Sequence, residues 1–213
     1  MFKAIIISTI FMLTSCESMS QRERILLNYN SEKVKTYESN LVQEDQYTTN
    51  GKYYHHKYYK HLIGIARYLI EEKQFAIVKH SIGFYYDKRE NTKSKLYLGI
   101  DIKIEAQPEL SRSTYHSVAG AFIRHYLTDI LQVLFSCKSV FREKEIVGIV
   151  AGFQWERNGK RELVTLWIAE DDILKYENNM LTLEEVIERN VITDTRGKII
   201  RLKLELSSHS TAI

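Results

Sequence analysis

The sequence contains very little proline and cysteine. One proline, Pro108, occurs in 213 residues, where average usage of ~5% would give about ten. This scarcity excludes a proline-rich linker and a polyproline ligand motif. Two cysteines, Cys16 and Cys137, are too few for a disulfide-dense small domain or a zinc ribbon. The remaining composition, with 44% hydrophobic and 27% charged residues, is typical of an ordinary globular domain.

A strong charge of either sign is also missing. The formal net charge is +3, which does not indicate nucleic-acid binding, because a surface that follows phosphates needs clustered Lys and Arg. Common enzyme signatures are absent: the chain has no G-x-S-x-G, H-E-x-x-H, C-x-x-C, Walker or G-x-G-x-x-G pattern. The sequence therefore favours a binding or assembly protein over an enzyme. It predicts no catalytic residue, no metal site and no cofactor.

The first sixteen residues have the layout of a signal peptide. A single lysine precedes an apolar run over 4–13, which is shorter than the ~20 residues that a membrane-spanning helix needs. The run ends in Leu13-Thr14-Ser15-Cys16. This tetrapeptide resembles the lipobox of bacterial lipoproteins, in which a leucine and two small residues precede a cysteine.

The resemblance implies a lipid anchor on Cys16. In bacterial lipoproteins this cysteine receives a diacylglyceryl thioether and the chain is cut before it. The cleaved bond here would therefore join Ser15 to Cys16, with 1–15 as the signal peptide. Two or more acyl chains make such attachment effectively stable. We expect a lipid-anchored membrane protein of a bacterial cell envelope that faces the periplasm or the cell surface. The alternatives are an ordinary secretory signal with an incidental cysteine, or a short buried helix.

A polar segment follows Cys16 and extends to residue 52. Such a segment buries too little apolar surface to offset the entropy lost on ordering, and without proline it lacks stiffness. We therefore expect residues 16–52 to form the lipidated N-terminus and a flexible tether. Its one apolar stretch, 25–29, could dock on the domain. We expect a single folded domain over 53–213.

Hydrophobic periodicity predicts the elements of this domain. Apolar residues at helical spacing predict helices over about 54–72 and 112–136, and a shorter helix ending near 189. Alternating apolar and polar residues predict strands. The predicted strands are 78–86, 96–105, 145–155, 161–169 and 198–206.

Turn and capping signals connect these elements. Asn158-Gly159 predicts a tight hairpin turn, because both residues accept positive φ at low cost. Thr182 and Glu185 form a capping box that opens the short helix. Consecutive strands joined by short turns pair antiparallel. The expected fold is α+β, with an antiparallel sheet of about five strands and two main helices on one face.

Two short segments suggest an internal duplication. Gly83-Phe-Tyr-Tyr aligns with Gly152-Phe-Gln-Trp at an offset of 69 residues, and each segment follows a predicted helix. Chance similarity between two helix–hairpin units is the simpler interpretation. A true duplication would give a pseudo-symmetric pair with a groove between the units.

The most unusual run spans 53–61, with four tyrosines, three histidines and two lysines. His61 follows the other two histidines by five and six residues, about 100–140° around a helix axis, so these histidines cannot chelate one metal together. Tyr54, Tyr58 and His61 are the candidate binding residues, because aromatic and basic side chains together can stack on sugars or bases. The alternative is a helix start in which Tyr54 and Tyr58 cover the sheet edge.

An acidic run and one cysteine could also carry chemistry. Glu170-Asp171-Asp172 follows a predicted strand, where carboxylates can bind metal or transfer protons, but they are equally typical of a helix N-terminus. We expect the helix start there, and we expect Cys137 to be a small buried side chain.

Several functions remain open from the sequence. The favoured one is a binding or envelope-assembly module whose partners are the membrane, through the lipid on Cys16, and an envelope protein. A small envelope hydrolase would need Glu170, Asp171 or a histidine to converge in a pocket. A surface adhesin would contact host molecules through the tyrosine-rich end.

Overall fold

The computed structural model of the chain describes residues 19–89, 94–105 and 113–202. The predictions for the signal peptide, for cleavage between Ser15 and Cys16 and for the lipid on Cys16 lie outside these residues. Within the described ranges, no helix combines the length and apolar character needed to cross a bilayer.

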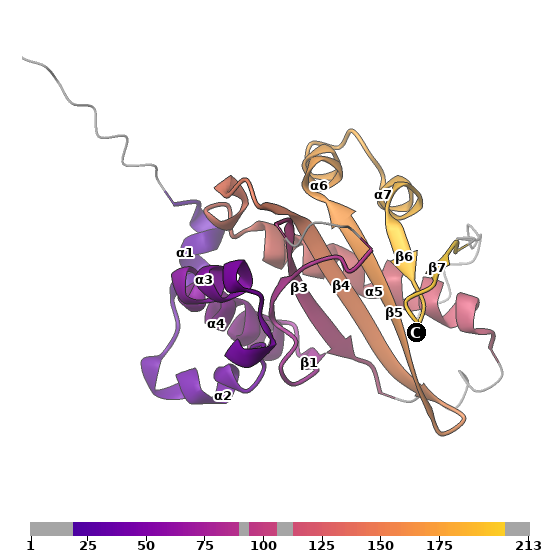
Figure 1. Cartoon of the computed structure of the whole chain (residues 1–213), viewed down its shortest axis with the longest axis horizontal. Coiled ribbons are helices and arrows are strands. Elements are labelled where there is room, and N and C mark those ends of the chain that lie inside the picture. The colour runs from indigo at the N-terminus through magenta and orange to yellow at the C-terminus, as the bar shows by residue number, and fades with distance from the viewer. Residues whose placement is uncertain (1–18, 90–93, 106–112, 203–213) are drawn as a thin grey trace, which may run out of the picture.

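Helices make up most of the first part of the described chain, and strands follow (Figure 1). The helices are α1 (Gln21–Leu27), α2 (Val34–Glu38), α3 (Thr49–Lys57), α4 (Tyr59–Arg67), α5 (Tyr115–Phe135), α6 (Glu170–Glu177) and α7 (Leu183–Arg189). The strands are β1 (Ala76–Ile77), β2 (Gly83–Tyr85), β3 (Leu96–Lys103), β4 (Ile146–Arg157), β5 (Lys160–Ala169), β6 (Val191–Thr193) and β7 (Ile199–Ile200). Short 3-10 turns lie at Ser31–Lys33, Glu44–Gln46 and Val140–Arg142.

The described strands form one mixed sheet in the order β1-β3-β4-β5-β6-β7, with β2 also paired to β3. The expected antiparallel pairs are present, including the β2–β3 and β4–β5 hairpins. The expectation of an entirely antiparallel sheet of about five strands is wrong, because β3 and β4 pair in parallel. Helix α5 crosses back along the sheet between these strands, so β4 starts from the same end as β3.

One face of the sheet carries the helices and the hydrophobic core. Leu98 of β3 and Phe153 of β4 are fully buried in the same core as Ile130 of α5. Helix α6 lies on this side too, because the Tyr176 hydroxyl is 3.4 Å from the Thr128 hydroxyl of α5. In Figure 1, α5 passes behind the sheet, and none of the described helices lies in front of it. The α+β fold with its helices on one face is therefore confirmed.

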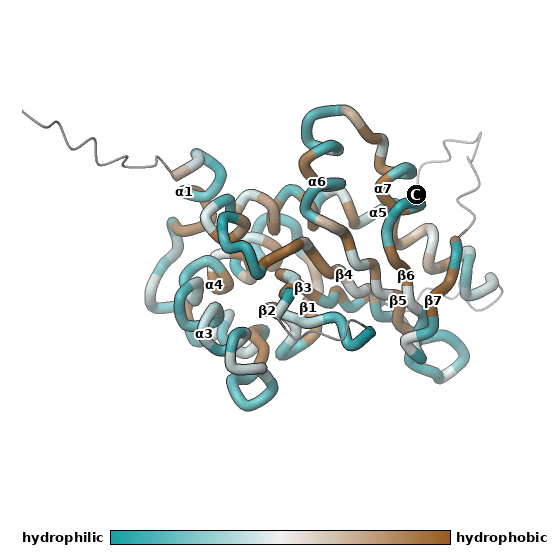
Figure 2. The backbone as a smooth tube through the Cα atoms, turned by 45° about the horizontal axis from the view of Figure 1, so that its top comes forward, coloured by the Kyte–Doolittle hydropathy of each residue, from teal (hydrophilic) through white to brown (hydrophobic). Residues whose placement is uncertain are grey.

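The segment expected to be a flexible tether is folded where the structure describes it. Leu26, Tyr37 and Leu41 are buried and belong to the main core. Figure 2 shows this region as largely hydrophilic chain interrupted by short hydrophobic stretches. The prediction for 16–52 is wrong over 19–52, since a few well-placed apolar residues are enough to dock short helices on a core that already exists. The docking of 25–29 was correctly anticipated.

The helix predicted over 54–72 differs at its start and in its middle. It begins at Thr49 and is divided at Tyr58, which leaves helical geometry with φ −111° and ψ 20°. It ends as expected at residue 72, in a π-helical turn over Tyr68–Glu72. Because of this break, the axes of α3 and α4 point in different directions.

The strand predicted over 78–86 is wrong for its first half: only β2, Gly83–Tyr85, forms within it, and β1, Ala76–Ile77, lies before its predicted start. His80 lies between the two strands. This residue adopts a φ of 59°, which an extended strand does not allow. The next N–H groups, of Ser81 and Ile82, donate to the carbonyl oxygen of Asn40 instead of a neighbouring strand. The alternation of side chains continues through the break, so the sequence pattern did not reveal it.

The end of the sheet contains one strand that was not predicted. Strand β6, Val191–Thr193, pairs antiparallel with both β5 and β7, and three residues are too few for a periodicity to be recognised. The strand predicted over 198–206 is seen as Ile199–Ile200, and residues 203–206 lie outside the described ranges.

The two helix–hairpin units join in one continuous sheet. Strands β3 and β4 pair directly over eight positions, so the groove expected between duplicated units does not form there. Gly83 lies in the short strand β2, whereas Gly152 lies in the long central strand β4.

Candidate functional site

The structure brings together the three predicted binding residues, but mostly inside the protein. The rings of Tyr54 and Tyr58 stack at 6.3 Å, and Tyr58 meets His61 edge-on at 5.4 Å. Tyr54 and Tyr58 are 5% and 6% exposed, and both rings pack on Phe84 of β2. The alternative interpretation, tyrosines that cover the sheet, describes them correctly.

The hydroxyl groups of these tyrosines link α3 and α4 to the chain before β4. Tyr54 donates to Glu145 at 2.8 Å, and Tyr58 donates to Glu143 and to the carbonyl oxygen of Ser139. Burial, together with these carboxylates, raises the pKa of both phenols. Lys57 also donates to Glu143, at 2.6 Å, and this bond lowers the pKa of the Glu143 carboxyl. The tyrosine-rich run thus fixes α3 and α4 to the segment that precedes β4.

His61 belongs to a small buried polar cluster. Its Nε2 lies 2.9 Å from the carboxylate of Glu23 on α1 and 3.1 Å from Oγ of Ser139, and Ser139 Oγ donates to the same carboxylate. A Ser-His-acid triad uses both ring nitrogens, one for the serine and one for the acid. Here both partners contact Nε2. The arrangement therefore holds α1 in place and does not activate Ser139.

The acidic run after β5 forms the first turn of α6, as expected. Asp171 pairs with Lys175 one turn later, and Asp172 accepts a hydrogen bond from Asn190 at 2.9 Å. Carboxylates in this position are favoured by the helix dipole. In the described part of the chain, no group of three or more histidine, cysteine or acidic side chains is placed to hold a metal ion.

Cys137 is a core residue, as predicted. Its side chain is fully buried, and burial raises the pKa of the thiol. A thiol in this state is a poor nucleophile.

The second face of the sheet carries a partly accessible set of polar and aromatic side chains. Side chains that alternate with the core residues of β3, β4 and β5 point to this face, and no described helix packs on it (Figure 1). We call it the open face and define it by five residues: Tyr97, Asp101, Gln154, Thr165 and Trp167.

An aromatic pair dominates one end of the open face. Tyr97 of β3 and Trp167 of β5 meet edge-to-face with their ring centroids 5.1 Å apart. The guanidinium of Arg89 lies 5.4 Å above the Trp167 ring, in a cation–π contact. Tyr97 and Trp167 lie seventy residues apart in sequence and are held together by the sheet, and Arg89 lies in the connection between β2 and β3.

Asp101 lies on the same face of the sheet, four residues after Tyr97 on β3. Its neighbour in the parallel register is Gly152 of β4, and a Cβ at position 152 would overlap Oδ1 of Asp101. The missing side chain of Gly152 thus leaves the space that the carboxylate occupies. The backbone N–H of Asp101 donates to Ser81 Oγ at 3.2 Å. Among the described residues, none donates a hydrogen bond to its carboxylate.

The surroundings of Asp101 are unfavourable for a charge. Burial raises the pKa of its carboxyl to about 6, and the positive charge of Arg161 offsets part of that effect. Tyr85 covers the neighbouring Gly99 with its ring and donates its hydroxyl to the Ser81 carbonyl at 2.6 Å, so this donor is not available to Asp101. Asp101 is therefore a half-buried acceptor with no donor among the residues that the structure describes.

A cavity of about 330 Å³ lies at the other end of the open face. Lys103 and Gln154, two positions beyond Asp101 and Gly152 on their strands, line it together with Arg161. The open face therefore runs from an aromatic end to a polar, charged end, with Asp101 between them.

Sequence reasoning did not identify these residues. The alternation along β3 was recognised, but the residues that alternate with its apolar side chains, such as Tyr97 and Asp101, were expected to face solvent. A signal was present, because tyrosine, glycine and aspartate on that side differ from an ordinary solvated strand. Comparison of the chain with family models, with curated proteins and with solved structures finds no match to any of them.

Proposed function

We propose that the chain is a lipid-anchored protein of a bacterial cell envelope and that it binds a protein partner through the open face of its sheet. The anchor rests on the lipobox-like Leu13–Cys16. The binding role rests on one observation above all: a half-buried carboxylate to which no described residue donates, on the same sheet face as a partly buried aromatic pair.

The side-chain types on the open face support a protein partner. Trp, Tyr and Arg are the residues most enriched at the energetic centres of protein interfaces, and here Tyr97 and Arg89 both contact Trp167. Asp101 receives no hydrogen bond from the described part of the chain, and a half-buried acceptor in this state costs free energy that a donor from a partner would recover. The partner should therefore present a hydrogen-bond donor opposite Asp101.

The same geometry favours binding over hydrolysis. General acid–base catalysis at a hydrolytic site needs a second titratable group close to the first. The charge that lowers the pKa of Asp101 is that of Arg161, which does not exchange protons in proteins. Tyr85 also interacts electrostatically with Asp101, but burial raises its pKa well above the usual range and its hydroxyl donates to the Ser81 carbonyl.

The binding role is tested by photo-crosslinking in intact cells. A photoreactive residue replaces Thr165 on the open face or, as a matched control, the exposed Ala121 of α5 on the opposite side. We expect one discrete adduct from position 165, absent from position 121 and lost when Trp167→Ala is added. The same adducts from both positions, or none from position 165, would contradict the proposal.

The anchor is tested separately by detergent-phase partitioning. The wild type should enter the detergent phase and incorporate labelled fatty acid, whereas Cys16→Ala should do neither. Cys137→Ala is the matched control, because Cys137 is buried in the core. Equal partitioning of wild type and Cys16→Ala would exclude the anchor.

A further inference from the structure

The chain between the proposed lipid attachment and the folded domain is short. Four residues, 17–20, separate Cys16 from the first residue of α1. Fully extended, the five steps from Cys16 to Gln21 cover about 16–18 Å. If Cys16 is lipidated, as proposed above, α1 stays within that distance of the membrane surface.

Helix α1 is fixed to the rest of the domain. Glu23 is 2% exposed and contacts His61 and Ser139. The carbonyl oxygen of Ile25 accepts a hydrogen bond from Arg67 of α4 at 3.1 Å. At Gly64 of α4 a Cβ would overlap the backbone of α1, so the two helices pack at close range. The domain therefore moves with α1.

The outer side of α1 combines basic and apolar side chains. Arg22 and Arg24 are exposed, and neither forms an ion pair with a described residue. Ile25 is 50% exposed and Met19, just before the helix, is 42% exposed. Exposed apolar residues next to unpaired basic ones are typical of helices that lie on anionic membranes.

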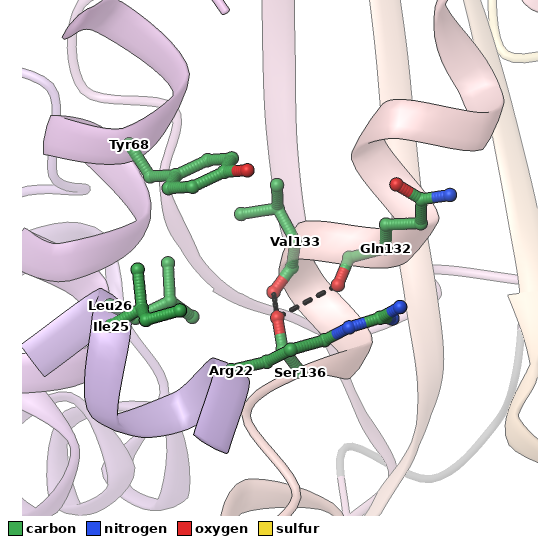
Figure 3. Close-up of a pocket in the computed structure, with 7 residues that line it drawn as sticks. All are labelled: Arg22, Ile25, Leu26, Tyr68, Gln132, Val133 and Ser136. Atoms are coloured by element: carbon green, nitrogen blue, oxygen red, sulfur yellow. Dashed lines mark hydrogen bonds between the residues drawn. The ribbon is translucent and has the colours of Figure 1, made fainter. Parts of the chain in front are cut away.

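A hollow beside α1 continues this surface (Figure 3). It has a volume of about 290 Å³ and lies between Ile25, Tyr68 and the C-terminal end of α5 at Val133. Figure 3 shows the Arg22 side chain reaching toward Gln132, near that end of α5. The carbonyl end of a helix attracts a positive charge, which holds Arg22 at the rim of an apolar hollow.

We propose that α1 and this hollow form a membrane-docking surface, with Ile25 and Met19 at the level of the lipid head groups and Arg22 and Arg24 against phosphates of anionic phospholipids. This proposal rests on the proposed lipid anchor. The docked domain would hold one fixed orientation, with the β4–β5 turn pointing away, since α1 and that turn lie toward opposite ends of the molecule (Figure 1).

The test uses the full lipidated protein reconstituted into vesicles. Dyes are attached through Ile25→Cys or, as a control, Lys160→Cys at the β4–β5 turn, and Cys137 is protected from labelling because it is fully buried. The vesicles contain phosphatidylcholine and phosphatidylglycerol with nitroxide-labelled head groups. We expect strong quenching at position 25 and little at position 160.

Charge reversal tests the role of the two arginines. Arg22→Glu with Arg24→Glu should lower the docking equilibrium by about 30-fold in these vesicles. The matched control Lys160→Glu with Arg196→Glu changes two residues that are exposed and far from α1 in sequence, and it should leave quenching unchanged. In vesicles of pure phosphatidylcholine, which carry no net charge, Arg22→Glu with Arg24→Glu should also leave quenching unchanged.

Failure of the protein to float with the vesicles would overturn the anchor and the docking together. Flotation without preferential quenching at position 25, or equal effects of both charge reversals, would overturn the docking surface alone.

Discussion

Asp101 and Gly152 face each other across the parallel pair β3–β4, and the carboxylate of Asp101 fills the place where a side chain at 152 would lie. This relationship depends on the parallel pairing that the α5 crossover creates. It also makes the carboxylate sensitive to a single added methyl group.

Gly152→Ala should therefore displace the Asp101 side chain and destabilise the fold. The overlap with Oδ1 resembles overpacking, which costs about 1–3 kcal/mol. Urea unfolding measures the loss. In an Asp101→Ala background the same substitution should cost distinctly less, because the overlapping group has been removed. Equal costs in both backgrounds would show that the two residues are not coupled.

The raised pKa of Asp101 predicts a specific dependence of stability on pH. The folded-state pKa of about 6 lies above the ordinary aspartate value of 3.8, so the folded state binds the proton more tightly than the unfolded chain. The contribution of Asp101 to stability is fully present below pH ~4 and is lost as pH rises through about 6.

Asp101→Asn should accordingly stabilise the protein at pH 7.5 by about 1–3 kcal/mol, with little gain at pH ~4. Urea unfolding at the two pH values measures the difference. Asp171→Asn, on the exposed first turn of α6, is the control and should lack this pattern. A gain for Asp101→Asn that does not depend on pH would contradict the assignment.

The two tryptophans should respond differently to truncation. Trp155 is fully buried against Tyr115 and Phe122, so Trp155→Ala should cost about 3–5 kcal/mol. Trp167 lies on the open face, and Trp167→Ala should cost roughly 0.5–1.5 kcal/mol, the value of its aromatic contact. Chemical unfolding ranks the two. A severe loss of stability in Trp167→Ala would mean that this side chain serves the fold.

Glu23 should control the attachment of α1. Glu23→Ala removes the acceptor shared by His61 and Ser139, and loss of a buried hydrogen-bonded group costs about 1–3 kcal/mol. We expect faster tryptic cleavage after Arg22 and Arg24 in this variant. Glu32→Ala, on an exposed turn, is the control and should keep the wild-type cleavage rate. Rapid cleavage of the wild type itself would show that α1 is not docked.

Local signals in the sequence predicted the local structure well. Asn158 and Gly159 form the β4–β5 turn with φ values of 53° and 70°, and Thr182 with Glu185 forms the capping box of α7. Each depends on the chemistry of neighbouring residues, which a sequence displays directly.

Features that depend on distant segments were not predicted. The parallel pairing of β3 with β4 follows from how α5 packs, and the folding of 19–52 follows from contacts such as that of Tyr37 with Glu71. The open face was missed for the same reason, since Tyr97 and Trp167 meet through strands seventy positions apart in sequence. Tyr54 and Tyr58 were singled out for their composition, although their neighbours in space make them core residues.

The packing of α1 has a kinetic consequence if the anchor is present. A domain held by a few residues searches for partners in a thin layer along the membrane plane and not in a deep volume above it. Confinement of this kind raises the effective concentration toward partners in the same membrane. It also excludes targets beyond the reach of the domain itself, so α1 would determine which neighbours the open face can meet.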